Sequence, residues 1–100
     1  MEQKLPQDTK KQIQIKAQDK VLAGKYANAA QVTHTKEEFV LDFMSIFPPA
    51  GTLNSRVIMS PGHFKRMIVA MQDNLQKYES KFGSVDQAEE PDVIHGFPVK

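Results

Sequence analysis

The chain has 100 residues, of which 40% are hydrophobic and none is cysteine. This length suits one small domain with a modest core, and the lack of cysteine excludes disulfide scaffolds, thiolate metal sites and thiol nucleophiles. No apolar run approaches the roughly 18 residues of a membrane span, and the polar start MEQKLPQDTKKQ is unlike a signal peptide, so we expect a soluble, cytoplasmic protein without a membrane partner.

The charges are unevenly spread, although the formal net charge is only +1. Residues 1–83 carry twelve Lys and Arg against eight Asp and Glu, whereas residues 84–100 carry one Lys against four carboxylates. A mildly basic body attracts polyanions, but this excess is far below that of a dedicated nucleic-acid-binding protein.

The first third of the chain contains two weak strand signals. Residues 1–11 have no apolar periodicity, so we expect a disordered basic arm. The alternation in QIQIK, residues 12–16, predicts a short edge strand with Ile13 and Ile15 on one face. Residues 26–35 predict a second strand.

The stretch 35–47 fits two structures. Thr35 with Glu38 matches a helix capping box, and the apolar residues that follow also fit helical spacing. The same run alternates at period two, is rich in aromatic residues and ends at Pro48-Pro49, as a strand before a turn would. We favour the strand because short connections between neighbouring strands build an antiparallel meander.

A fourth strand is predicted over residues 53–60, and a long helix follows it over residues 61–82. Ser60 is a suitable N-cap, Pro61 suits the first helical position, and Gly83 is a natural stop. A helix of this length spans roughly 33 Å, more than a small sheet needs as cover, which suggests a second partner. The apolar residues at helical spacing are Phe64, Met67, Ile68, Met71, Leu75, Tyr78 and Phe82.

These elements predict an α+β fold: a four-stranded antiparallel meander followed by one long C-terminal amphipathic helix packed on one face of the sheet. We expect residues 12–83 to form a single domain and residues 84–100 a flexible acidic tail. Such a small domain gains stability from dimerisation, so a homodimer is expected, joined through the helix or through a sheet edge.

The order of several motifs resembles a known family. QIQIK, GKYANAAQVTHTKEEFVLDF, a Pro/Gly loop and SRVIMSPGHFKRMIVAMQDNLQKYESKFG, within residues 12–83, are similar to the short bacterial and archaeal proteins grouped as domain of unknown function 3467. The resemblance implies a β-rich sheet followed by one long helix. It brings no catalytic residue and no cofactor to transfer.

The start of the predicted helix is basic, which is unusual because acidic residues favour the positive end of the helix dipole. One interpretation is an anion site at the free N–H groups, and the other is ordinary surface charges paired with Glu37, Glu38 or Asp42. Basic and aromatic residues on the sheet would extend such a site. The candidate anion or nucleic-acid ligands are His63, Lys65, Arg66, Arg56, Lys25 and Tyr26.

A polar residue lies within one candidate helix seam. With Phe64 and Met67 at heptad positions a and d, Met71 and Asn74 occupy the next pair, where an asparagine fixes the register of paired helices. The alternative places Asn74 at the edge of the stripe, in water. The candidate dimer interface, for which we expect antiparallel helices, comprises Met67, Met71, Asn74, Leu75 and Tyr78.

No catalytic constellation is visible, so we expect no enzyme, cofactor or metal site. His34, His63 and His95 lie in separate segments, and Ser60 lacks a nucleophile motif. Two functions remain: a homodimeric protein-interaction module with an unknown protein partner, or a dimeric binder of single-stranded nucleic acid or another polyanion. The predicted topology also resembles in outline the single-stranded-DNA-binding coactivator and whirly folds, an analogy that carries little information about function.

Overall fold

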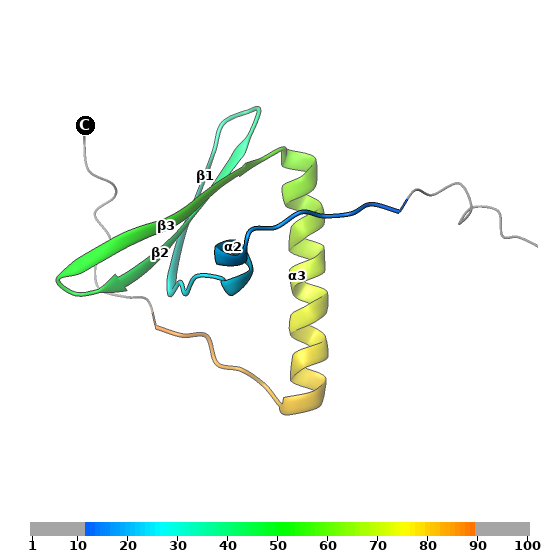
Figure 1. Ribbon diagram of the computed structural model, residues 1–100. Helices are drawn as coiled ribbons and strands as arrows, with labels where there is room; N and C mark the ends of the chain where they lie inside the picture. The colour runs from blue at the N-terminus through cyan, green and yellow to red at the C-terminus, as the bar shows by residue number, and fades with distance from the viewer. Residues whose placement is uncertain (1–11, 90–100) are drawn as a thin grey trace, which may run out of the picture.

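The computed structural model describes residues 12–89. Its elements in chain order are α2 (Asp19–Ala23), β1 (Ala29–His34), β2 (Phe39–Phe47), β3 (Ala50–Met59) and α3 (Pro61–Phe82). The three strands form an antiparallel sheet in the order β1-β2-β3, and α3 descends beside it (Figure 1). The α+β class and the order of sheet and helix are confirmed. The predicted arm at 1–11 and the tail from residue 90 onward lie outside the described residues.

The prediction of a strand at residues 12–16 is wrong, so the sheet has three strands and not four. These residues form no strand, and Ile13 and Ile15 are 81% and 87% exposed. Two alternating isoleucines mark a strand only where a neighbouring edge accepts their backbone hydrogen bonds. Along the chain these residues are followed by the short helix α2, an element that the sequence pattern did not predict, and not by a strand that could pair with them.

The helix alternative for residues 35–47 is also wrong, and the strand interpretation is confirmed as β2. The Thr35 hydroxyl accepts hydrogen bonds from the backbone N–H groups of Glu37 and Glu38, at 3.1 and 3.2 Å, within the turn between β1 and β2. The Thr35 N–H donates to the Glu38 carbonyl at 2.9 Å. A threonine hydroxyl satisfies free N–H groups equally well in a turn and at a helix start, so the capping-box pattern was ambiguous.

The hairpin of β2 and β3 is tighter than predicted. Only Pro48 and Pro49 separate the strands, so β3 begins at Ala50, three residues earlier than expected. A bulge follows, because Phe43 pairs with Ser55 and Met44 with Leu53, which leaves Asn54 as the extra residue of β3.

Helix α3 has the predicted bounds. The Ser60 hydroxyl accepts a hydrogen bond from the His63 N–H at 3.2 Å, and Pro61 occupies the first position. At the other end Gly83 has φ +100°, a conformation that side chains disfavour, and its N–H donates to the Glu79 carbonyl at 2.9 Å. Neither described helix combines the length and the apolarity that crossing a bilayer requires.

The core is small, and α3 contributes little to it. Among residues 12–89 the buried apolar side chains are Leu41 and Met44. Within α3 only Phe64, Met67 and Glu79 are half-buried. The expected packing of the whole helix on one face of the sheet is therefore confined to its first turns, where the Phe64 ring stacks on Phe39.

Candidate interaction surface

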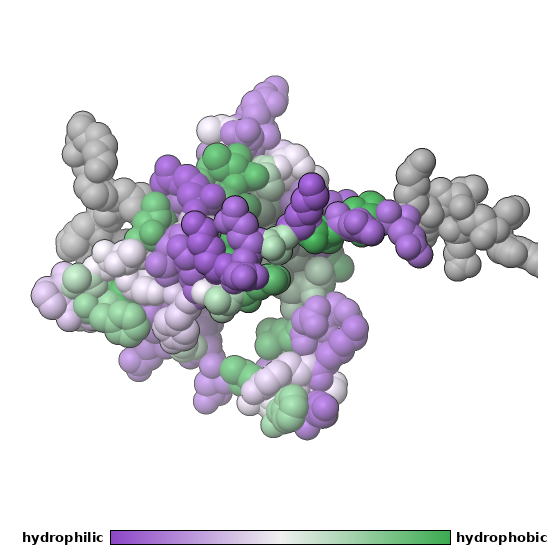
Figure 2. Space-filling model, in the orientation of Figure 1, coloured by the Kyte–Doolittle hydropathy of each residue, from purple (hydrophilic) through white to green (hydrophobic). Residues whose placement is uncertain are grey.

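One face of α3 carries large apolar side chains that remain open to solvent. Ile68 is 39% exposed, Met71 61%, and Phe82 66%. Figure 2 shows an opening between the lower part of α3 and the sheet, so the sheet leaves this part of the helix uncovered. We call this face the α3 stripe; it begins at the half-buried Phe64 and continues through the exposed Ile68, Met71, Leu75, Tyr78 and Phe82.

The spacing of the α3 stripe is that of a helix pairing surface. Its members follow one another at intervals of four, three, four, three and four residues. Any two successive intervals span seven residues, which is the heptad spacing that paired helices use for their shared seam. The opposite side of α3 is hydrophilic, since Lys77 and Asp73 form an ion pair there at 3.1 Å with both side chains exposed.

The five residues predicted for a dimer interface divide between the stripe and its edge. Met71, Leu75 and Tyr78 are stripe members. Met67 is half-buried beside it, and the exposed Asn74 donates from Nδ2 to the Ala70 carbonyl of its own helix at 3.2 Å. The exposed apolar stripe therefore runs through Ile68 and Leu75, with Met67 and Asn74 along its edge.

The basic residues at the start of α3 contact one another and not an acidic residue of the same turn. Its first turn contains no acidic residue. Arg66 lies with Nη2 2.7 Å from the His63 Nδ1, which accepts this hydrogen bond when that nitrogen carries no proton. Lys65 is exposed on the adjacent side of the helix, at the edge of the α3 stripe.

Arg56, another predicted anion ligand, is engaged by a buried carboxylate. Its Nε and Nη2 donate to the two oxygens of Asp42 at 2.6 and 3.1 Å. Asp42 is only 2% exposed. The hydrogen bond and the charge of Asp42 raise the pKa of the Arg56 guanidinium, so the arginine remains charged. This bidentate pair joins β2 to β3 and gives Arg56 a structural role.

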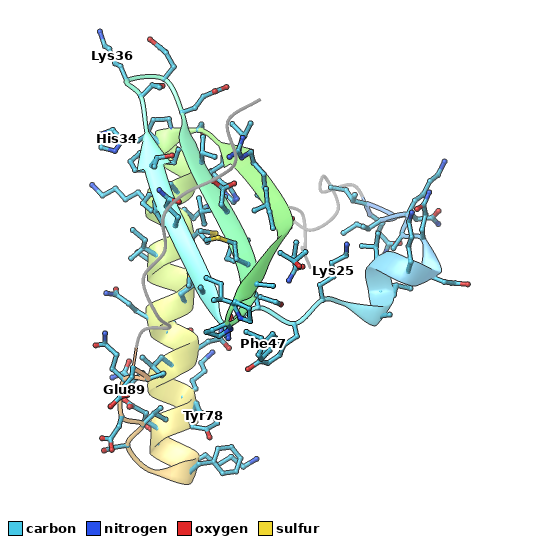
Figure 3. The ribbon with its side chains drawn as sticks, turned by 90° about the vertical axis from the view of Figure 1, so that its left-hand side faces the viewer. Lys25, His34, Lys36, Phe47, Tyr78 and Glu89 are labelled. Carbon is cyan, nitrogen blue, oxygen red and sulfur yellow. The ribbon has the colours of Figure 1, made fainter. Side chains whose placement is uncertain are left out.

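Lys25 and Tyr26 lie at the other end of the sheet from the start of α3. In Figure 3, Lys25 and Phe47 mark one end, while His34 marks the end where α3 begins. The Tyr26 and Phe47 rings are 6.5 Å apart, and His34 contacts Phe39 with ring centroids 5.2 Å apart. The structure therefore divides the six predicted anion ligands among three places and does not bring them together.

Sequence reasoning missed an amide network that joins the YANA segment to the sheet. The Asn28 side chain donates to the Ile46 carbonyl at 2.9 Å and accepts from the Ile46 N–H at 2.8 Å. The Asn54 side chain donates to the Tyr26 carbonyl at 2.6 Å and to the Ser45 hydroxyl at 2.8 Å. Asparagine is disfavoured in strands, and that was the available signal. The network is structural.

Within residues 12–89, no group of three or more His, Asp or Glu side chains is placed to bind a metal ion. His34 and His63 have the separate contacts described above. His95 lies outside this part of the chain.

The family model described as "Protein of unknown function (DUF3467)" matches residues 1–87. Since this match spans most of the chain, the protein belongs to that family, and the resemblance found in its motifs is confirmed. No curated protein and no solved structure matches the chain.

Proposed function

We propose that this family member is a non-enzymatic protein-interaction module that works as a homodimer, with two chains joined through the α3 stripe. The observation that carries the proposal is the uncovered stripe with its heptad spacing. An apolar surface of this pattern on a small domain marks a site of protein association. A second copy is the occupant because a heptad seam is complementary to another helix that has the same seam.

The exposed fractions give a rough scale for the association. Fully burying a Leu, Ile, Met or Phe side chain contributes about 1.5–3 kcal/mol. Five stripe members on each chain, from Ile68 to Phe82, are between 39% and 66% exposed. Covering them on both chains contributes on the order of 10 kcal/mol before the loss of rotational and translational freedom is subtracted. Contacts with the sheet would add to this, and we expect a dissociation constant in the micromolar range.

The small core supports the same proposal. A domain of this size depends on a well-filled core or on association for its stability. With Leu41 and Met44 as the buried apolar side chains of residues 12–89, the folded chain leaves much of its apolar surface to water. A second copy that covers α3 would supply the missing burial.

The polar residues best placed for chemistry already have structural partners, which supports a non-enzymatic role. Ser60 caps α3, and Asp42 is held by Arg56 in a bidentate pair. A nucleophile needs a neighbouring base within hydrogen-bond reach, and a general acid needs a perturbed carboxyl or imidazole in a cleft. Neither arrangement is formed by the side chains described above.

Light scattering after size exclusion tests this proposal with two matched variants. Met71→Glu places a charge in the centre of the stripe, while Val69→Glu places the same charge off the stripe at a residue that is equally exposed, 62% against 61%. We expect the unmodified chain and Val69→Glu to show twice the 11.3 kDa chain mass at about 100 μM, and Met71→Glu to show a monomer. A monomeric unmodified chain, or a Met71→Glu dimer of unchanged affinity, would contradict the proposal.

A further inference from the structure

We infer that the two copies of α3 pair antiparallel, so that Lys65 of each chain lies against Glu79 of the other. This inference rests on the proposed homodimer and specifies its geometry. Parallel and antiparallel pairing of two α3 helices would bring different residues together, and the inference follows from this difference.

The stripe is centred on residue 73, midway between its first and last members, Phe64 and Phe82. An antiparallel pair crossing at this point makes three kinds of layer. In these layers Phe64 meets Phe82, Ile68 meets Tyr78, and Met71 meets Leu75 of the second copy. Each of these layers occurs twice by symmetry, so the whole stripe is covered over its length.

The residues on one edge of the stripe are complementary only in this orientation. Lys65, Gln72 and Glu79 follow at intervals of seven on that edge. In an antiparallel pair this edge meets the same edge of the second copy, so Lys65 faces Glu79 twice and Gln72 faces itself near the axis. Glu79 is half-buried and Lys65 exposed in the single chain.

The other edge, which carries Met67, Asn74 and Lys81, is also complementary in the antiparallel orientation. The two copies of Asn74 lie near the axis, where their side-chain amides hydrogen-bond each other. The aliphatic part of Lys81 covers Met67 of the other chain. In a parallel pair each edge would meet the opposite edge instead, and Lys65 would find no acidic residue. The basic first turns, with His63, Lys65 and Arg66, would then lie side by side and repel each other.

The position of the sheet favours the same orientation. Each sheet contacts the first turns of its own α3, through Phe39 and Phe64. Antiparallel pairing keeps the two sheets at opposite ends and brings the free half of each helix toward the sheet of the other chain. The face that carries Phe39 still has apolar surface to offer there, since Val32 and Val57 are 50% and 40% exposed.

Disulfide trapping tests the orientation directly, because the natural chain has no cysteine. Gln72→Cys is expected to form a cross-linked dimer under mild oxidation, since the two copies of this residue lie near the axis. Ile68→Cys is expected to stay uncross-linked, because its two copies lie about 15 Å apart along the helices, beyond the reach of a disulfide. Cross-linking through Ile68→Cys but not Gln72→Cys would overturn the inference in favour of a parallel pair.

The mass of each reduced sample separates this inference from the proposal beneath it. A monomeric mass with no cross-link contradicts the homodimer itself. A dimeric mass with no cross-link at Gln72→Cys overturns only the antiparallel pairing and leaves the homodimer in place.

A charge exchange gives a second test with a different readout. Lys65→Glu should raise the dimer dissociation constant about threefold to tenfold, because two like-charge contacts replace two attractive ones. The double variant Lys65→Glu/Glu79→Lys should dimerise more tightly than either single variant. Glu79→Lys also removes the hydrogen bond from the Val85 N–H to the Glu79 carboxylate, and this loss is common to both variants that carry it.

Lys77→Glu, on the opposite face, is the control and should leave the affinity unchanged. A double variant weaker than both singles would overturn the pairing.

Discussion

The Phe64 ring of α3 stacks on the Phe39 ring of β2, with ring centroids 4.1 Å apart and planes inclined by only 6°. This contact fixes the start of the helix against the sheet. Beyond it the stripe side chains are exposed, so the parts of α3 have different roles. The first turn completes the fold, and the exposed stripe from Ile68 to Phe82 is the surface that we assign to a second chain.

This division predicts different effects for two alanine substitutions. Phe64→Ala should lower the free energy of unfolding by about 1–3 kcal/mol, because it removes a half-buried ring. Phe82→Ala, which removes a ring that is 66% exposed, should cost less than about 1 kcal/mol in the isolated chain. Urea denaturation in the Met71→Glu background, which isolates the monomer, measures both. Equal losses would mean that the whole helix packs on its own sheet.

The cap of α3 gives a second prediction. Ser60→Ala should cost about 1 kcal/mol in the free energy of unfolding, since it removes the acceptor for the His63 N–H. Ser60→Asp should retain most of the stability, because an aspartate caps equally well. Ser80→Ala, at an exposed position near the end of the same helix, is the control. If Ser60→Ala were as neutral as the control, the cap would contribute nothing.

The Asp42 and Arg56 pair predicts an asymmetric effect. Arg56→Gln leaves a buried carboxylate without its cation, whereas Asp42→Asn removes one charge partner from an arginine whose side chain is already 50% exposed to water. Arg56→Gln should therefore destabilise the fold more than Asp42→Asn. Thermal melts of the two variants at neutral pH measure this difference. Equal losses of stability in Arg56→Gln and Asp42→Asn would count against the burial of this charge.

The separation of the basic residues predicts weak binding to nucleic acid. Fluorescence anisotropy of a labelled single-stranded DNA, titrated with the protein at about 50 mM and about 200 mM salt, should show no micromolar complex at either concentration. Lys65 lies at the edge of the pairing surface, and Arg56 is held by Asp42. Micromolar binding that collapses at the higher salt concentration would restore the nucleic-acid interpretation and direct mutation to Lys65 and Arg66.

The sequence was most informative where local chemistry decides the structure. Ser60, Pro61 and Gly83 specify both ends of α3 by themselves, and the structure has the helix over the predicted residues. The period-two pattern of residues 39–47 was sufficient for β2, once Thr35 is understood as a turn residue. The strand expected at residues 12–16 failed because a strand also needs a neighbour, which two isoleucines do not specify.

The candidate surface could be predicted only in part for a similar reason. The amphipathic pattern of α3 identifies an apolar side but not how much of it the sheet covers. The part of α3 that the sheet covers depends on where Phe39 contacts the start of the helix and on the direction in which the chain leaves β3 before Ser60. The predicted seam therefore included Met67 and Asn74, which lie along the edge of the exposed stripe that runs through Ile68 and Leu75.

The measurement that tests the central claim most directly is an isotope-filtered NOE experiment on a mixture of ¹³C-labelled and unlabelled chains. It detects only contacts between two copies, and a dimer of 11.3 kDa chains is well within its range. We predict intermolecular NOEs from the methyl groups of Ile68 and Leu75 to stripe residues of the other chain, including one between Ile68 and the Tyr78 ring. If the stripe methyl groups show no intermolecular NOE at millimolar concentration, the claim that a second copy covers α3 is contradicted.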